Sequence, residues 1–244
     1  MRIALLAPLP PEQTGIADYA AHLRHALIEQ GLEVVTPLAG CLELPEQLKR
    51  LQAFDWRGVD LVHAELGGGR FGEFQALEYL RRAQPHLPLT ATVHDPERLI
   101  WRRAKLFFPL TLLERLPHPL PQAAALLADP LTLHEERRLA KGMRRLITLT
   151  RLGGDCLRQR MGLRPQQVAV IAHGNLPIAP QALPPLAPLR LLYFGFIYRG
   201  KGIEDLLLAL AQSLAAHPQC RGQVRLTLAG GTAPEMTFDP AGNY

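Results

Sequence analysis

A histidine and an aspartate stand where an apolar run ends, in the segment TVHDPE of residues 92–97. The preceding residues predict a buried strand, and Pro96 prevents that strand from continuing. A histidine at the end of a strand can donate a hydrogen bond to a sugar hydroxyl or to a phosphate. We therefore expect His94 to contact a substrate. The alternative is a structural histidine that is bonded within its own loop.

Glycines and cations are interspersed in the segment YFGFIYRGKG of residues 193–202. Gly195 follows an apolar, strand-like run, and Arg199 and Lys201 precede a helical pattern. Positive side chains and the free N–H groups at the start of a helix together suit a diphosphate. The segment predicts a loop that binds a diphosphate. The alternative is an ordinary turn between a strand and a helix with two incidental cations.

The loop from Pro8 to Gly15 follows the first apolar run, RIALLA, and leads into a helical pattern. Gly15 would let the backbone come close to a ligand, and Thr14 stands beside it at the expected start of the helix. We expect this loop to face a ligand. The alternative is a plain proline-rich connection.

The segment GGGRFG of residues 67–72 matches the pattern G-x-G-x-x-G, which is typical of dinucleotide-binding loops, and Asp95 follows about twenty residues later. However, the segment comes after the third predicted strand rather than the first. We therefore interpret Gly67, Gly68 and Gly69 as a flexible loop that faces a ligand. A simple glycine-rich turn and an NAD-binding oxidoreductase are the alternatives.

Strand-like and helical patterns alternate along the chain, which predicts βαβ units and a parallel sheet. Ile16, Tyr19, Ala20, Leu23 and Leu27 recur at helical spacing and are expected in the core. The predicted strands cover residues 2–7, 32–36, 60–66 and 88–95, and the predicted helices cover 16–30 and 74–82.

The region after Asp95 is broken by prolines between Pro109 and Pro121, where we expect an irregular insertion or a helical hairpin. Further strands are predicted in RRLITLT and in QQVAVIAHGN, so that residues 1–175 form one domain. A proline-rich linker is expected at 176–188. Residues 189–244 then start a second domain with two strands and a helix at 203–216, too few strands for a complete doubly wound sheet.

Composition limits the partners of the chain. The formal net charge of +5 and the pI near 9.4 permit anionic partners, but aromatic residues make up only 6% and do not intersperse with the arginine pairs, so nucleic acid is not predicted. Cys41, Cys156 and Cys220 are odd in number and far apart, and they indicate neither a disulfide framework nor a metal site.

Hydropathy indicates a cytoplasmic protein. No apolar run reaches the length of about 18 residues that a membrane span needs, and Ile3 to Ala7 is too short for the apolar region of a signal peptide. Contact with a membrane is expected to be peripheral at most.

Four segments, in their order along the chain, resemble family 4 glycosyltransferases of the GT-B fold: LAPLPPEQTGIADYAAHL, TVHDP, VIAHGN and LLYFGFIYRGKGIEDLLLAL. The resemblance extends over most of the chain. It implies an α/β fold with Rossmann-like parallel sheets that carry helices on both faces, in two domains. Members of this family transfer a sugar from a nucleotide donor with retention of configuration.

The resemblance also implies roles for single residues. His94 would contact the donor sugar near the reacting centre, and Lys201 would hold the donor diphosphate. The loop that ends at Gly15 would line the cleft between the domains, with Gly15 close to the donor phosphate. Thr14, together with Gly67, Gly68 and Gly69, would face the acceptor, and residues 176–188 would form the hinge. The implied donor is a UDP- or GDP-sugar and the implied acceptor a glycan or a lipid-linked saccharide, with no cofactor and no metal.

Two departures from the family pattern shape the expectation. The family usually carries an arginine after the glycine that matches Gly195, where this chain has Phe196, although Arg199 could substitute for it. The acidic E-x7-E segment that grips the donor would lie beyond Tyr244. We therefore expect a retaining glycosyltransferase with little or no activity as this chain alone, completed by a partner chain or by further sequence. The alternative is a non-catalytic acceptor-binding or scaffold module.

Overall fold

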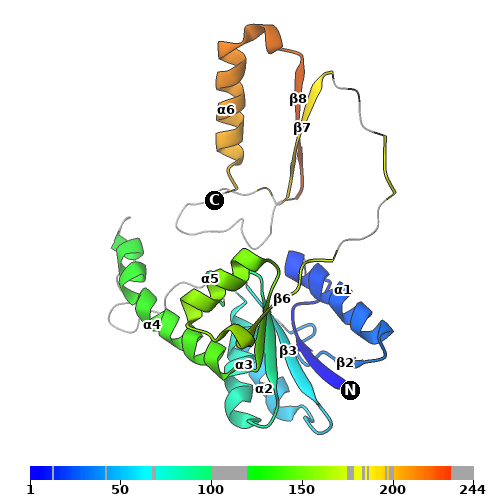
Figure 1. Ribbon diagram of the computed structural model, residues 1–244, viewed down its shortest axis with the longest axis vertical. Coiled ribbons are helices and arrows are strands. Elements are labelled where there is room, and N and C mark those ends of the chain that lie inside the picture. Colours follow the sequence, from blue (N-terminus) through cyan, green and yellow to red (C-terminus); the bar gives the residue numbers. More distant parts are fainter. Residues whose placement is uncertain are drawn as a thin grey trace. The chain divides into compact units, whose positions relative to one another are not determined.

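The computed structural model describes residues 1–12, 14–41, 43–67, 70–99, 120–174, 179–182, 185, 187–195, 197 and 201–231. The chain divides into two compact units, Met1–Asn175 and Leu176–Tyr244. Helices and strands occur in both units (Figure 1).

A six-stranded parallel sheet forms the centre of the first unit. Its strands are β1 (Arg2–Leu6), β2 (Glu33–Val35), β3 (Leu61–Leu66), β4 (Leu89–Val93), β5 (Arg145–Thr148) and β6 (Val168–Val170). The order across the sheet is β2-β1-β3-β4-β5-β6, and every neighbouring pair is parallel. This arrangement confirms the predicted Rossmann-like α/β fold.

Helices cover both faces of this sheet. They are α1 (Gly15–Glu29), α2 (Leu44–Ala53), α3 (Phe71–Ala83), α4 (Leu120–Gly142) and α5 (Arg151–Met161), followed by a short 3-10 turn, η2 (Pro165–Gln167). Successive strand residues point to opposite faces. Leu5 therefore packs in a small cluster with Ala20 of α1, whereas Ala4 and Leu6 face the larger cluster.

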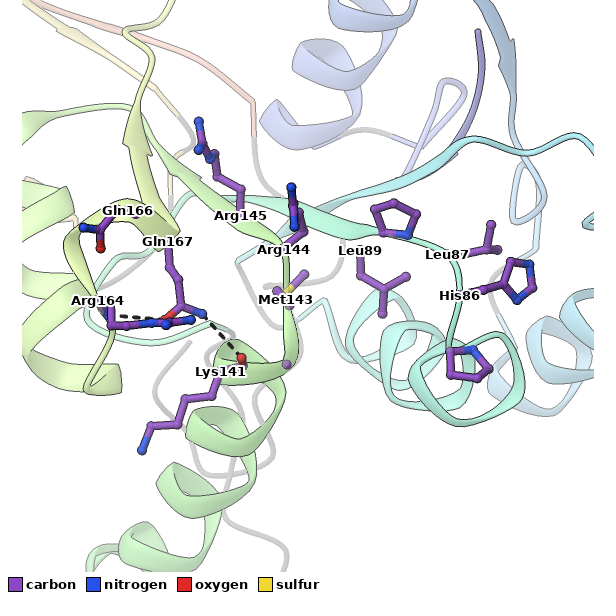
Figure 2. Close-up of a pocket in the computed structure, with 13 residues that line it drawn as sticks. His86, Leu87, Leu89, Lys141, Met143, Arg144, Arg145, Arg164, Gln166 and Gln167 are labelled. Atoms are coloured by element: carbon purple, nitrogen blue, oxygen red, sulfur yellow. Dashed lines mark hydrogen bonds between the residues drawn. The ribbon is translucent and has the colours of Figure 1, made fainter.

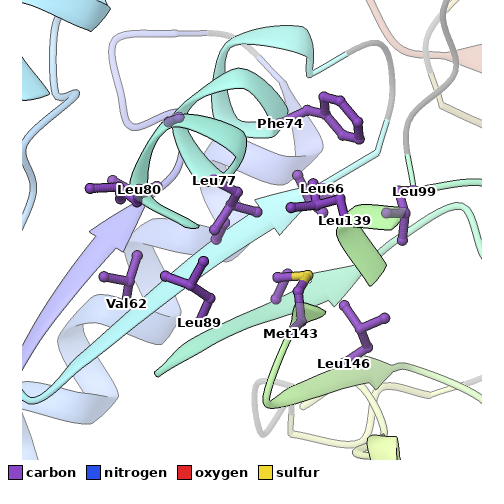
Figure 3. Packing of buried hydrophobic residues seen from close by; sticks show 14 of the residues in the cluster. Val62, Leu66, Phe74, Leu77, Leu80, Leu89, Leu99, Leu139, Met143 and Leu146 are labelled. Atoms are coloured by element: carbon purple, nitrogen blue, oxygen red, sulfur yellow. The ribbon is translucent and has the colours of Figure 1, made fainter. Parts of the chain in front are cut away.

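The larger cluster joins the sheet to α2, α3, α4 and α5 (Figure 3). Val62 and Leu66 of β3 contribute to it from the sheet, and Leu77 of α3 and Leu139 of α4 from the helices; all four are fully buried. Burying an aliphatic side chain of this size stabilises a fold by about 1.5–3 kcal/mol, so this layer fixes the sheet as a rigid platform.

Two helices of the first unit were not predicted. Helix α2 starts with Leu44 and Pro45, and Leu44, Leu48 and Leu51 recur in it at helical spacing. Helix α5 begins after Thr150, whose side chain accepts a hydrogen bond from the Gly153 N–H, and it ends at Gly162 in the left-handed conformation. These are ordinary start and stop residues of a helix. The proline-broken stretch from Pro109 to Pro119 lies outside the described residues.

The second unit contains a βαβ arrangement. Strands β7 (Leu189–Phe194) and β8 (Val224–Ala229) pair in parallel, and between them the chain forms α6 (Ile203–Ala216) and a 3-10 turn, η3 (Pro218–Cys220). Helix α6 spans the residues that were predicted to be helical. The described residues of the expected linker, at 179–182, 185 and 187–188, form neither helix nor strand. That the second domain is incomplete stays a prediction.

Among the described residues, none of the helices has both the length and the apolar character required to cross a membrane.

Candidate functional site

The strand order places a topological switch point between β1 and β3. From β1 the chain moves to β2 on one side, and it then returns to β3 on the other side. In open parallel sheets, ligands bind beside the carboxyl ends of the strands at such a point, because the two flanking loops diverge there. The loop after β1 contains Thr14 and Gly15, and the loop after β3 begins at Gly67.

A ladder of polar side chains runs along β3 and β4 towards this edge. His63 and Glu65 alternate with apolar residues of β3, so both point to the face that α1 covers in part. The parallel register pairs His63 with Thr90 and Glu65 with Thr92 on β4. The four side chains are buried, and Glu65 is fully inaccessible to solvent.

Glu65 holds two imidazole rings. Its Oε2 lies 2.8 Å from Nε2 of His94, and its Oε1 lies 3.2 Å from Nε2 of His63. Burial raises the pKa of the Glu65 carboxyl, but hydrogen bonds and charge from His63 and His94 outweigh burial and hold the pKa below its usual value. Glu65 is therefore a carboxylate at neutral pH, and it can only accept hydrogen bonds.

The charge of Glu65 determines which hydrogen bonds His94 can form with a ligand. Because the carboxylate only accepts, Nε2 of His94 carries a hydrogen that it donates to Glu65. A neutral His94 then presents Nδ1 as an acceptor for a hydroxyl, and a protonated His94 presents it as a donor to a hydroxyl or a phosphate. Within the described part of the chain, Nδ1 of His94 takes part in no hydrogen bond. From the sequence, His94 was predicted only to donate a hydrogen bond to a ligand.

His63 links the carboxylate to the two threonines. The Thr90 hydroxyl donates to the backbone oxygen of Val62, at 3.1 Å, so Thr90 accepts from Nδ1 of His63, at 2.9 Å. Nε2 of His63 lies 3.0 Å from Oγ1 of Thr92 and 3.2 Å from Glu65. It either accepts from the Thr92 hydroxyl or carries a second proton towards Glu65. His63 is thus an interior member of the ladder.

Tyr19 of α1 and His173, after β6, surround His94. The Tyr19 ring meets His94 edge-on at a centroid distance of 5.1 Å, and it meets His173 at 5.2 Å. Burial and the nearby charge of Glu65 raise the pKa of the Tyr19 hydroxyl, against the effect of its hydrogen bond with Thr92. Tyr19 therefore stays protonated. We call His63, Glu65, His94, Tyr19 and His173 the histidine–glutamate cluster.

An ion-pair network joins the loops on the two sides of the switch point. Arg70, at the start of α3, pairs with Glu12 of the loop after β1 and binds Glu73 through two nitrogens, at 2.5 and 3.1 Å. Burial alone would lower the pKa of Arg70, but Glu73 and Glu12 raise it, so the guanidinium is charged. This network fixes the spacing of the loops that flank the switch point.

A second buried pair anchors the segment after His94. Arg98 donates to Oε1 of Glu136 on α4 at 3.3 Å, and the backbone N–H of Leu99 donates to Oε2 at 3.4 Å. Arg98 and Glu136 are both buried. Because breaking such a pair leaves an uncompensated buried charge, the chain that leaves His94 is held firmly against α4.

Thr14 and Gly15 begin α1, as the predicted loop requires. The Thr14 hydroxyl oxygen accepts from the Ala17 N–H at 3.1 Å and caps the helix, so the O–H hydrogen remains available to a ligand. Space is open around Gly15, where an added Cβ would meet no atom within 4 Å. Contact of this loop with a ligand stays a prediction.

Close packing explains why glycine stands at both ends of the segment 67–72. Gly67 has a φ of +145°, and an added Cβ would lie 2.9 Å from Cβ of His94 and 2.9 Å from Oδ2 of Asp95. A Cβ at Gly72 would lie 2.3 Å from Oε1 of Gln47 on α2. Gly67 therefore lets β3 end directly beside His94. Gly68 and Gly69 lie outside the described residues.

Of the predicted donor-binding residues, Gly15 belongs to the first unit, and Gly195, Arg199 and Lys201 belong to the second. The Gly195 N–H donates to the Ala229 oxygen at 3.0 Å, which continues the pairing of β7 with β8. Lys201 is exposed and directly precedes Gly202, the residue before α6. Arg199 lies outside the described residues. The site residues that the structure brings together are thus His94 and Gly67.

The sequence analysis missed Glu65, and it did not foresee that His63 and His173 accompany His94. A usable pattern was present, since His63 and Glu65 are two ionisable residues at alternate positions of an otherwise apolar strand. Across the described residues, no group of three or more His, Cys, Asp or Glu side chains is arranged to hold a metal ion.

The chain matches no known protein-family model and no curated protein sequence. Among solved structures, it is similar to an ABC transporter solute-binding protein from Conexibacter woesei DSM 14684, with 15% identity and a TM-score of 0.32 over 70% of this chain and 69% of that one. It is also similar to the Escherichia coli transcriptional repressor ascG, with 10% identity and a TM-score of 0.28 over 72% of this chain and 79% of that one. Likenesses at this level carry no conclusion about function.

Proposed function

We propose that this cytoplasmic chain acts in sugar transfer, as a retaining glycosyltransferase that uses a UDP- or GDP-sugar and delivers the sugar to a glycan or a lipid-linked saccharide. One observation carries the proposal. At the carboxyl edge of the sheet, a buried carboxylate fixes His94 through Nε2 and leaves Nδ1 to a ligand. Hydroxyl groups of a sugar are suitable partners for such a nitrogen.

His94 and Glu65 position the sugar in this proposal. Glu65 sets the orientation of the imidazole, and His94 binds a hydroxyl of the donor sugar through Nδ1. The edge of the Tyr19 ring limits the movement of His94 from the side of α1. Holding a substrate in one geometry can contribute several kcal/mol to lowering a barrier.

Lys201 and the start of α6 bind the donor diphosphate in this proposal. As the bond from the anomeric carbon to the diphosphate oxygen breaks, negative charge develops on the diphosphate, and an ammonium and a helix N-terminus both stabilise it. The acceptor oxygen forms the new bond to the anomeric carbon, and its proton passes to the departing diphosphate. Acidic residues in the first turn of α6, Glu204 and Asp205, favour the helix itself.

Ligand-observed NMR tests the proposal with UDP- and GDP-sugars. We expect saturation transfer from the chain to both the nucleotide and the sugar of one donor. The Lys201→Ala variant should weaken binding of the whole donor by roughly tenfold, which corresponds to about 1.4 kcal/mol. The His94→Asn variant should reduce saturation transfer to the sugar and leave the nucleotide signals unchanged.

His25→Asn is the matched control, because His25 is exposed on α1 and pairs with Glu29 at 3.2 Å, away from Glu65. It should leave both parts of the donor spectrum as they are in the wild type. The proposal is wrong if no nucleotide sugar binds, or if the three variants change binding alike. A transfer assay with radiolabelled donor then measures whether this chain alone turns over, where we expect little or no product.

A further inference from the structure

A cationic groove lies at the opposite edge of the first sheet from the histidine–glutamate cluster. It has a volume of about 880 Å³ and is formed where the chain enters β4 and β5, together with η2. Segments 85–89, 141–145 and 164–167 line it, so three stretches far apart in the sequence meet there (Figure 2). We call it the amino-edge groove.

Four cations line the amino-edge groove: Lys141, Arg144, Arg145 and Arg164. His86 adds an imidazole, and no aspartate or glutamate is among the lining residues. All four cations are exposed. In Figure 2, Arg144 and Arg145 extend towards the top of the view, while Arg164 lies beside Gln167 and Lys141 below them.

The four groove cations differ from other arginines of the first unit in their ion pairs. Arg70 and Arg98, for example, form ion pairs with carboxylates. Within the described ranges, none of the four groove cations forms such a pair. The carboxyl end of α4 is the nearest source of negative charge on the backbone, and it is equivalent to only about half an elementary charge. Four positive charges therefore exceed it several-fold.

The frame beneath these side chains is firm. Leu87, Leu89 and Met143 are buried, and the Arg144 N–H donates to the Leu89 oxygen at 2.8 Å, which ties the entry of β5 to β4. The Gln167 amide donates to the Lys141 oxygen at 3.4 Å, which ties η2 to the end of α4. Long cationic side chains thus stand on a preformed concave surface, as in sites that capture anions.

We propose that the amino-edge groove binds two or more phosphate groups at the same time, either on one polyphosphate molecule or on neighbouring headgroups of a lipid surface. Arg144 and Arg145 extend away from Arg164 and Lys141 in Figure 2, so several phosphate groups can contact more of these cations than a single phosphate can. The volume suits a ligand of nucleotide size, since small-molecule sites commonly measure about 300–1,000 Å³. Guanidinium groups bind phosphate oxygens in pairs, and three of the four cations are arginines. The proposal does not rest on the proposed sugar transfer, which uses the other edge of the sheet.

Titration calorimetry with inorganic tripolyphosphate tests this proposal. The Arg144→Gln/Arg145→Gln variant should bind roughly tenfold more weakly than the wild type, or worse, because two charge-assisted contacts are lost. The control is Arg24→Gln/Arg221→Gln, which removes the same charge from two exposed arginines outside the groove and should bind like the wild type. Equal melting temperatures of the three proteins would show that each is folded.

Vesicles of phosphatidylcholine with and without phosphatidic acid distinguish a soluble phosphate ligand from phosphate headgroups on a lipid surface. Binding of tripolyphosphate that only the groove variant loses supports a soluble ligand. Sedimentation with phosphatidic acid vesicles that only the groove variant loses supports phosphate headgroups on a lipid surface. Absence of binding to both probes, or an equal loss in the groove variant and the control, would overturn the proposal, since binding would then follow net charge alone.

Discussion

The Glu65→Gln substitution tests whether a buried carboxylate holds the histidine–glutamate cluster together. Glu65 is fully buried; its carboxylate accepts from Nε2 of His94 at 2.8 Å and lies 3.2 Å from Nε2 of His63. An amide of the same size is uncharged, with one oxygen that accepts and one NH₂ group that cannot. His94 therefore exchanges a charged acceptor for a neutral oxygen or for no acceptor, which costs about 1–3 kcal/mol in a buried site.

Scanning calorimetry at neutral pH measures the loss of stability in the Glu65→Gln variant. A loss of about 2 kcal/mol lowers the Tm of a domain of this size by roughly 4–8 °C. Glu46→Gln is the control, since Glu46 is exposed and pairs with Arg50 at 3.4 Å on one helix face. Its loss should cost less than about 0.5 kcal/mol.

Acid titration gives the same prediction a second readout. The pKa of Glu65 in the folded chain is lower than the ordinary value of 4.5 for a glutamate, so the unfolded chain binds the proton more readily. The contribution of Glu65 to stability is therefore complete above a pH of about 4.5, and it is lost as the pH falls through the lower pKa of the folded state. The variant lacks this part of the acid-induced decline. A Glu65→Gln protein as stable as the wild type at neutral pH, with the same acid profile, would refute the reasoning.

Two further substitutions test the backbone around the site. Gly67→Ala places a Cβ 2.9 Å from His94 and forces an unfavourable φ of +145°, so we expect urea unfolding to show a loss of at least about 2 kcal/mol. Gly174→Ala, where space is open, should change little, and equal losses at both positions would contradict the packing argument. Thr150→Ala removes the cap of α5 and should cost about 1 kcal/mol, with faster hydrogen exchange in the first turn of the helix. Thr150→Ser should restore both values, and an unchanged exchange rate in the alanine variant would show that the cap is not needed.

The local hydrophobic pattern of the sequence was sufficient to predict the central strands and the first helix. Apolar runs separated by helical spacing predicted β1, β3, β4 and α1, because buried parallel strands and amphipathic helices carry their periodicity in the sequence. The start of α6 followed from the same kind of pattern. Helix α2 was missed although Leu44, Leu48 and Leu51 recur at helical spacing and Pro45 stands in its first turn, where proline is favoured.

The candidate site was only partly predictable, for a physical reason. His94 stands at a strand end, where a ligand-facing residue is expected. Glu65 lies inside a strand, and only the register of β3 against β4 shows that its charge has partners. The amino-edge groove depends on three segments that no local window contains, so its concentration of charge emerges only in the folded unit.

The polar ladder on β3 and β4 also has a consequence for how the sheet assembles. Side chains alternate across a strand, so a shift of β3 by one residue would carry His63 and Glu65 into the apolar layer beside Leu77, and it would turn Val62 and Ala64 the other way. A carboxylate buried there without partners costs several kcal/mol. Competing alignments of the two strands are thereby disfavoured. The cluster that holds His94 thus also selects the register in which β3 and β4 pair.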